Sequence, residues 1–141
     1  MKRDDTLLKE FCDVLPAHPP IAVEFRHESW YAEDVYALLR SKDVAMCVAD
    51  SPKHRTPTEL TASWGYVRLH GGEDEVSYGA TALQEWAGRI AGFATRADPI
   101  YVFFNNDRAG NAVIDALSLT EKVRATGTAV APAPGGEREV S

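Results

Sequence analysis

The sequence predicts an α/β fold built from parallel strand–helix units. Four mainly apolar runs have the β-branched and aromatic residues of strands, and each ends in polar residues: 21–27, 44–50, 65–70 and 100–107. Helical patterns follow three of these runs, which is typical of a parallel sheet covered by helices. Ligands of such sheets gather beyond the carboxyl ends of the strands, so the polar residues indicate where a site is expected.

The amino-terminal part of the chain is expected to contain two helices and two strands. Apolar residues at three- and four-residue spacings predict a helix over 4–15, which ends at the prolines that follow it. After the first strand, an apolar stripe predicts a helix over 33–41, and the second strand follows at 44–49. The polar stretch 50–61 carries two prolines and is expected to be a long loop and a candidate functional segment.

The carboxy-terminal part continues this alternation. The third strand ends at His70 before two glycines, and an acidic loop at 73–75 leads to a helix expected over 80–95. The fourth strand, over 100–105, precedes a last helix over 109–124. The chain is therefore expected to hold four strand–helix units.

These units predict one domain over residues 1–125. Residues 126–141 are mostly Ala, Pro, Gly and charged residues, and are expected to be a disordered tail. A closed eight-stranded barrel typically takes about 250 residues, whereas this chain has 141. Four parallel strands alone leave two edges and one face uncovered. We therefore expect the (βα) units to form half of a TIM-type barrel.

Composition and charge narrow the classes of function. The formal net charge of −6 disfavours sequence-independent binding of nucleic acid, which needs a basic surface. No apolar run approaches the roughly 20 residues that cross a bilayer. Residues 1–5 do not resemble a secretory signal, so a cytoplasmic location without a membrane partner is expected. Cys12 and Cys47 lie in helix and strand patterns and fit small core residues better than ligands.

Charged side chains are expected on the inner face of the sheet. Because side chains alternate along a strand, Glu24 and Arg26 share one face of the first strand, and Arg68 and His70 share the corresponding face of the third. Buried charges need partners, and Glu24 can pair with Arg26 or Arg68. Two interpretations stay open, a structural ion-pair network or an anion-binding and acid–base cluster. The second is favoured because the charges lie where sites form in these sheets.

Further candidate residues stand at the ends of the other strands. His27 closes the first strand, Asp50 the second, and Asn105 and Asp107 follow the fourth. Asp50 could equally cap a turn, and the residues after the fourth strand could be turn formers. Asn105 belongs to the inner face by alternation and is the strongest candidate of its group.

Metal binding is a weaker interpretation of the same residues. No pair of them has the tight spacing of a zinc motif, so no metal is assigned and no cofactor is identified. The side chains that could together supply metal ligands are Glu24, His27, Asp50, His70 and Asp107.

Four segments resemble the hallmark segments of the YecE-like family, domain of unknown function 72: VEFRHESW at 23–30, DSP at 50–52, YVRLHG at 66–71 and YVFFNND at 101–107. They occur in the family's order and at similar spacing. The resemblance implies a TIM-type barrel of bacterial and archaeal cytoplasmic proteins, of which this chain resembles the C-terminal half. The pocket residues that it implies are Glu24, Arg26, His27, Asp50, Arg68, His70, Asn105 and Asp107.

The sequence departs from the family pattern in two places. The family's amino-terminal strand, of the Gly-Thr-Ser-Gly-Trp type, is absent, so half of the implied pocket wall is expected to be missing. Around Asn111, family members commonly show a pattern that includes a histidine. No role of that histidine is transferred to this chain.

The leading functional hypothesis is a strand-end pocket for a small anionic ligand that carries a phosphate or carboxylate. Arg26 and Arg68 would hold the anion, His70 would transfer protons, and Glu24 would orient or tune it. One alternative is a half-barrel without independent activity, which forms a homodimer or needs a separate N-terminal half. Another is a metal-assisted barrel that processes nucleic acid, which the net charge disfavours. Whether the protein is an enzyme stays open.

Overall fold

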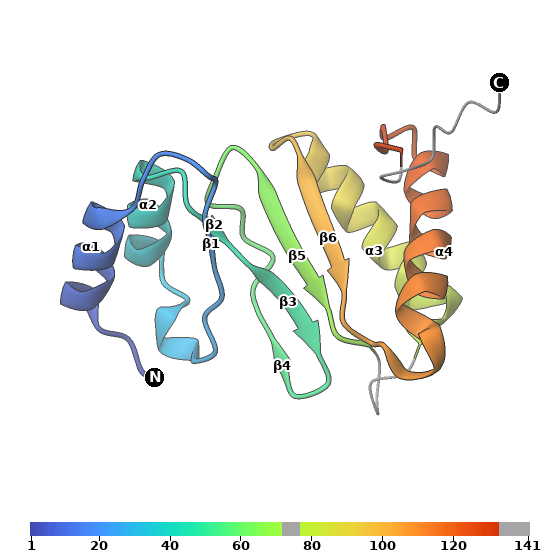
Figure 1. Cartoon of the computed structure of the whole chain (residues 1–141), viewed down its shortest axis with the longest axis horizontal. Coiled ribbons are helices and arrows are strands. Elements are labelled where there is room, and N and C mark those ends of the chain that lie inside the picture. The colour runs from blue at the N-terminus through green and yellow to red at the C-terminus, as the bar shows by residue number, and fades with distance from the viewer. Residues whose placement is uncertain (72–76, 133–141) are drawn as a thin grey trace, which may run out of the picture.

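Strands and helices both occur along the chain, and the predicted α/β class is confirmed (Figure 1). The computed structural model describes residues 1–71 and 77–132. Each predicted helix begins and ends within two residues of the observed one. The elements are α1 (Asp5–Val14), β1 (Ala22–Val23), η1 (Glu28–Trp30), α2 (Glu33–Ser41), β2 (Ala45–Met46), β3 (Val48–Ser51), β4 (His54–Arg55), β5 (Gly65–Leu69), α3 (Gly79–Ala94), β6 (Ile100–Phe104), η3 (Arg108–Gly110) and α4 (Asn111–Ala125). Helices follow β1, β5 and β6, whereas β2, β3, β4 and β5 follow one another without a helix between them.

The strands form a two-stranded sheet of β1 and β2 and a four-stranded sheet in the order β4, β3, β5 and β6, which together make one curved layer of mainly parallel strands. β1 pairs with β2, β3 with β5, and β5 with β6, all in parallel, while β4 is an antiparallel neighbour of β3. β2 and β3 are separated only by Cys47, whose backbone N–H donates to the carbonyl of Val23 (2.8 Å). The parallel strands therefore lie in the order in which they occur in the chain: β1, β2 with β3, β5 and β6.

A threonine side chain replaces a strand beside β2. The hydroxyl of Thr61 accepts from the N–H of Met46 (2.7 Å) and donates to the carbonyl of Val44 (2.7 Å). Thr61 is 1% exposed, so these backbone groups have no water to bind and need this partner. This exchange explains why the strand expected over 44–49 is divided into two short strands.

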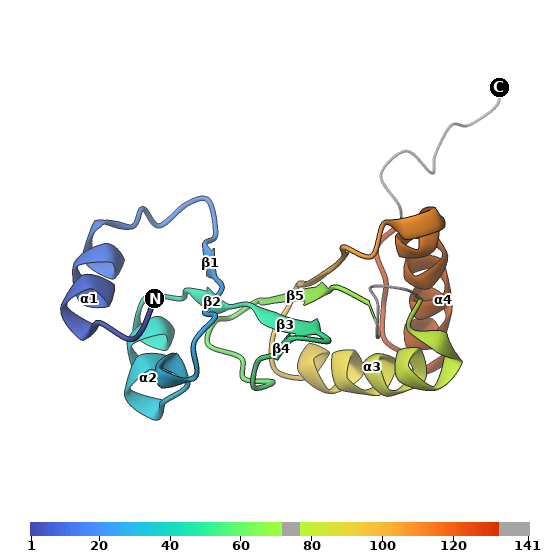
Figure 2. The same ribbon diagram turned by 90° about the horizontal axis from the view of Figure 1, so that it is seen from below.

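The helices pack on one side of the sheet. Figure 2 shows α1 and α2 beside the β1–β2 end and α3 and α4 beside the β5–β6 end, around the outside of a curved sheet. One core lies between α3, α4 and strands β3, β5 and β6, and a second lies between α1, α2 and strands β1 and β2. Leu69 in the first core and Leu39 in the second are fully buried. None of the helices that the structure describes covers the inner side of the sheet.

The first strand is shorter than the expected 21–27. β1 ends at Val23, because the carbonyl of Phe25 accepts from the side chains of Tyr31 (2.7 Å) and His54 (3.1 Å) instead of from a neighbouring strand. The residues that follow Val23 therefore extend from the sheet without the full ladder of backbone hydrogen bonds.

The prediction of a loop over 50–61 is wrong for the first half of that segment. β3 and β4 form a hairpin there, in which the hydroxyl of Ser51 donates to the carbonyl of His54 (2.9 Å). Polar composition and prolines predict a loop, but they do not show that residues 50–51 pair with residues 54–55. The hairpin brings His54 to the end of β1.

The described residues that follow α4 contact the rest of the fold. Val130 packs against the core of α3 and α4, so the described residues 126–132 continue beyond α4 along the fold. The acidic loop at 73–75 and the rest of the predicted tail, 133–141, lie outside the described residues. Among the helices that the structure describes, none is long and apolar enough to cross a membrane.

Candidate functional site

Burial alternates along β5 and β6, as the sequence predicts for β5. Val67 and Leu69 of β5 are buried against the helices, while the residues between them are partly exposed. On β6, Tyr101 and Phe103 are 48% and 46% exposed. These two rings, with the alternate residues of β5, form the inner face of the sheet.

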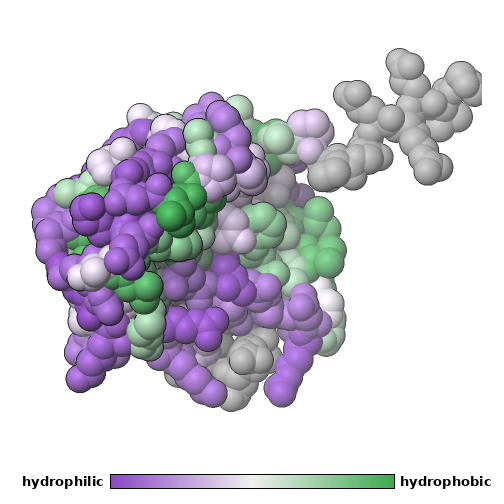
Figure 3. Space-filling view, turned by 60° about the vertical axis from the view of Figure 1, so that its left-hand side comes forward, coloured by the Kyte–Doolittle hydropathy of each residue, from purple (hydrophilic) through white to green (hydrophobic). Residues whose placement is uncertain are grey.

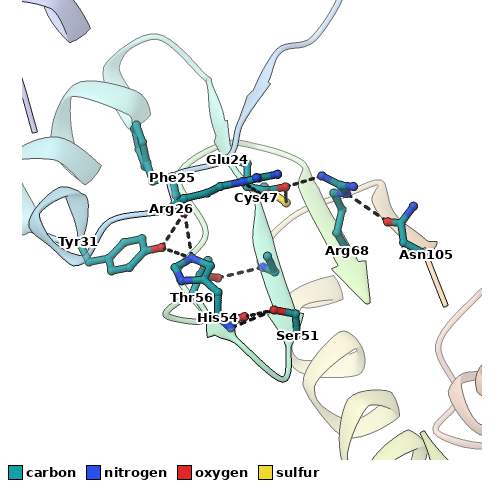
Figure 4. A network of polar contacts seen from close by, with 11 residues as sticks. Glu24, Phe25, Arg26, Tyr31, Cys47, Ser51, His54, Thr56, Arg68 and Asn105 are labelled. Atoms are coloured by element: carbon teal, nitrogen blue, oxygen red, sulfur yellow. Dashed lines mark hydrogen bonds and ion pairs between the residues drawn. The ribbon is translucent and has the colours of Figure 1, made fainter. Parts of the chain in front are cut away.

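A cluster of charged side chains lies on this inner face, at the carboxyl ends of the strands (Figure 4). Oε2 of Glu24 accepts from Nη1 of Arg68 (2.5 Å), and Oε1 of Glu24 accepts from Nε of Arg26 (3.2 Å). Nε of Arg68 in turn donates to Oδ1 of Asn105 (3.2 Å). The structure therefore brings together four of the residues predicted from the sequence, from three different strand ends.

The electrostatics of the cluster depend on Glu24. Burial acts to raise the pKa of Glu24, but the hydrogen bonds and charges of Arg68 and Arg26 outweigh it and hold the pKa below its usual value. Glu24 is therefore ionised at neutral pH. One carboxylate between two guanidinium groups leaves the cluster with a charge of +1, in a chain whose net charge is −6.

Cys47 lies beside this cluster and takes part as a neutral group. Its thiol is 3.8 Å from Oε2 of Glu24. Burial, with the nearby charge of Glu24, raises the pKa of Cys47 to about 12. The thiol therefore stays protonated and donates to the carboxylate. A neutral thiol is a weak nucleophile.

The two predicted histidines have different positions. His70 directly follows β5 and is partly exposed. Its backbone N–H donates to the carbonyl of Asp50 (2.9 Å). His27 caps the short helix η1, since its Nδ1 accepts from the N–H of Ser29 (3.2 Å). A local structural role therefore occupies one ring nitrogen of His27.

Two predicted acidic residues are not part of the cluster. Asp50 lies two residues after Val48 on β3 and therefore on the same, helix-covered side of the sheet. Its carboxylate pairs with Arg55 (2.8 Å) and accepts from Nε1 of Trp86 (3.2 Å). Asp107 is exposed before η3, and its carboxylate makes no hydrogen bond or ion pair with the residues that the structure describes. The strand-end position alone predicts neither side chain's direction.

A groove of about 520 Å³ runs along the inner face from the charged cluster. Glu24, Cys47 and Arg68 line it together with aromatic rings, of which Phe103 is the partner of Arg68 in the β5–β6 ladder. Alternation along β5 and β6 places Tyr66, Tyr101 and Phe103 on the inner face. The sequence did not predict them as site residues, because aromatic residues in strands more often pack in a core. The aromatic residues of the groove are Trp64, Tyr66, Tyr101 and Phe103.

A second group, not predicted from the sequence, supports the end of β1 (Figure 4). The hydroxyl of Tyr31 lies 2.7 Å from the carbonyl of Phe25 and 2.8 Å from Nε2 of His54. Burial raises the pKa of Tyr31 to about 12, so the hydroxyl is protonated and donates to the carbonyl. Phe25 stands between Glu24 and Arg26 in the chain, so this contact holds the backbone that carries both site residues. No local pattern predicts it, because 23 residues separate Tyr31 from His54.

The metal interpretation finds no support in the described part of the chain. Within residues 1–71 and 77–132, no three His, Cys, Asp or Glu side chains are grouped so that they could hold a metal ion. The carboxylates of Glu24 and Asp50 are both engaged by arginines, and they lie on opposite sides of the sheet.

Comparisons with known proteins identify a family for this sequence. The family model described as "Protein of unknown function DUF72" matches residues 1–138. A solved DUF72 family protein from Thermotoga maritima has 26% sequence identity and a TM-score of 0.77 over 87% of this chain and 54% of its own. A DUF72 family protein from Enterococcus faecalis has the same fold, with 17% identity and a TM-score of 0.74 over 87% of this chain and 55% of its own. This chain thus spans about half the length of the solved relatives, and no curated protein matches it.

Proposed function

The chain belongs to the DUF72 family, and from this membership and the inner-face geometry we propose that its groove binds a small anionic ligand that carries a phosphate or carboxylate. The YecE-like family is this same family, so the resemblance found in the sequence is confirmed. The family's description leaves the function open. The proposal therefore depends on the site, since one fold hosts many chemistries.

The observation that carries the proposal is the arrangement of Arg68 between Glu24 and Asn105. A guanidinium has five N–H donors, and these two partners use one donor each. None of the described residues accepts from the other three donors of Arg68. The side chain is 28% exposed, so these donors face the groove or its solvent. A guanidinium held in one orientation is well suited to bind a phosphate or carboxylate through paired hydrogen bonds.

Arg26 adds a second, more mobile cation to the proposed clamp. Its side chain is 77% exposed and is tied to the protein through Nε only. Glu24 orients both guanidinium groups, and its ionised state suits that role better than proton transfer. We retain His70 as the candidate proton-transfer group, because alternation along β5 directs residues 68 and 70 to the same face. His27, Asp50 and Asp107 are not part of the clamp that we propose.

Replacing Arg68 by alanine tests the clamp. We expect the affinity for inorganic phosphate, measured by isothermal titration calorimetry, to fall by about tenfold or more, because charge-assisted hydrogen bonds are lost. Arg68→Lys keeps the charge without the forked donors and should bind with intermediate affinity. Arg89→Ala, which removes an arginine on α3 that lies over the ring of Trp86, is the matched control and should leave the affinity unchanged. Equal phosphate affinity in Arg68→Ala and Arg89→Ala would contradict the proposed function.

A second candidate function is that of one half of a TIM-type barrel that acts only with a partner half. Hydrophobic side chains are exposed at both ends of the fold: Leu7, Phe11 and Val14 on α1, and Val113, Ile114 and Leu117 on α4. Figure 3, in which the α1 end comes forward, shows hydrophobic patches between hydrophilic ones. The open inner face and the sequential parallel strands also fit half of a barrel. The solved relatives contain about as much chain again.

The two candidates differ in what the protein does alone. If a partner half is needed, light scattering coupled to size-exclusion chromatography should give a mass above the 15.5 kDa of one chain, or phosphate binding should be absent. A monomer of 15.5 kDa that binds phosphate would exclude this second candidate. The nucleic-acid alternative is not carried forward, since neither the net charge of −6 nor the described residues support it.

A further inference from the structure

Aromatic rings lie directly beside the proposed anion clamp. In the parallel ladder of β5 and β6, Arg68 is paired with Phe103 and Tyr66 with Tyr101. Neighbouring strands are about 4.8 Å apart, so Phe103 lies next to Arg68 on the same face of the sheet. The charged and aromatic parts of the groove are therefore one continuous surface.

The aromatic part is a supported shelf with exposed rings. Trp64 is 8% exposed, and its ring contacts the ring of Tyr66 edge-on at 6.4 Å and that of Tyr101 at 6.0 Å. Tyr66 and Phe103 are tilted against each other at 5.0 Å. Phe103 still exposes 46% of its surface, which is unusual for a phenylalanine packed among other rings. Buried Trp64 thus holds in place rings that keep area available to a ligand.

We propose that the ligand of this groove carries its anionic group on a planar ring, as an aryl phosphate does. The inference rests on the proposed anion clamp and specifies its substrate class. The anion would bind Arg68, and the ring attached to it would lie on the shelf of Tyr66 and Phe103. Flat rings stack on aromatic side chains better than saturated rings of similar size, because their π systems interact as well as their apolar area.

The size of the groove supports a ligand larger than a bare anion. Its volume of about 520 Å³ lies in the range of pockets that bind organic molecules. Inorganic phosphate at Arg68 would leave the aromatic rings in contact with water. A ring on the shelf would instead remove apolar surface from water on both sides of the contact.

Three phosphate compounds test the inference by calorimetry: inorganic phosphate, cyclohexyl phosphate and phenyl phosphate. Phenyl phosphate should bind about threefold to tenfold more tightly than cyclohexyl phosphate, which matches its size without its planar ring. Phe103→Leu keeps an apolar side chain but removes the ring. This variant should abolish the preference for phenyl over cyclohexyl phosphate and leave the affinity for inorganic phosphate unchanged.

The outcomes separate this inference from the proposed function. Equal binding of phenyl and cyclohexyl phosphate, or an unchanged preference in Phe103→Leu, would overturn the planar-ring inference and leave the anion clamp intact. Failure of all three compounds to bind would overturn the clamp itself, and with it this inference. Leu117→Ala, at an exposed apolar position on α4, is the control and should change none of the three affinities.

Discussion

Replacing Leu69 by alanine is expected to lower the free energy of unfolding by about 2–5 kcal/mol, the range for a leucine removed from a packed core. Leu69 is fully buried in the core between the sheet and helices α3 and α4. Its neighbours on β5 and α3 are fixed by the sheet and cannot collapse fully into the space. Because domains of this size are only marginally stable, a loss near the upper limit would leave much of the protein unfolded.

Leu7→Ala is the matched control for Leu69→Ala. Leu7 on α1 is 45% exposed, so its loss should cost less than about 1 kcal/mol in urea unfolding followed by circular dichroism. Equal destabilisation by the two substitutions would contradict the burial of Leu69 relative to Leu7. A cost for Leu7→Ala that grows with protein concentration would instead indicate that α1 is covered in an oligomer, as the second candidate function requires.

Replacing Asp115 by alanine is expected to destabilise the protein by about 2–4 kcal/mol, because it leaves buried donors without an acceptor. Asp115 on α4 is 1% exposed. Its carboxylate accepts from the hydroxyl of Ser77 (2.7 Å), the backbone N–H of Tyr78 (3.0 Å) and Nδ2 of Asn106 (2.7 Å). The substitution therefore releases the start of α3 and the segment after β6 from α4 at the same time.

Glu121→Ala and Asp115→Asn give this prediction its controls. Glu121 is an exposed acidic residue on the same helix, and its loss should change stability by less than about 0.5 kcal/mol. Asp115→Asn keeps the shape but has only one oxygen to accept hydrogen bonds, so it should be intermediate. A thermal unfolding midpoint for Asp115→Ala equal to that of Glu121→Ala would show that the network contributes nothing to stability.

The Asp115 network also reaches the proposed site. The hydroxyl of Tyr78 donates to the carbonyl of Asp50 (3.2 Å) and accepts from the N–H of Gly71 (3.1 Å). Gly71 immediately follows His70, and its φ of 102° lies in a region that favours glycine. Asp115 thus holds Tyr78, and Tyr78 holds the end of the strand that carries Arg68 and His70.

The sequence by itself determined which residues of β5 face the helices and which face the open side of the sheet. Side chains alternate strictly along an extended strand, so the positions of Val67, Arg68 and Leu69 follow from local geometry. The same local character explains why the apolar periodicity of α2 predicts its bounds, 33–41, correctly. The charged residues of the inner face could be named for this reason before any contact was known.

Only the tertiary structure decided which of those residues meet. Glu24 and Arg68 are 44 residues apart, and their ion pair depends on how β1, β3 and β5 are ordered and aligned. Asp50 shares the helix-covered face with Val48 by alternation along β3, but only the tertiary structure brings Trp86 and Arg55 to its carboxylate. A strand's own sequence specifies alternation, whereas the neighbours of each side chain depend on long-range pairing and on the packing of helices, which no local pattern contains.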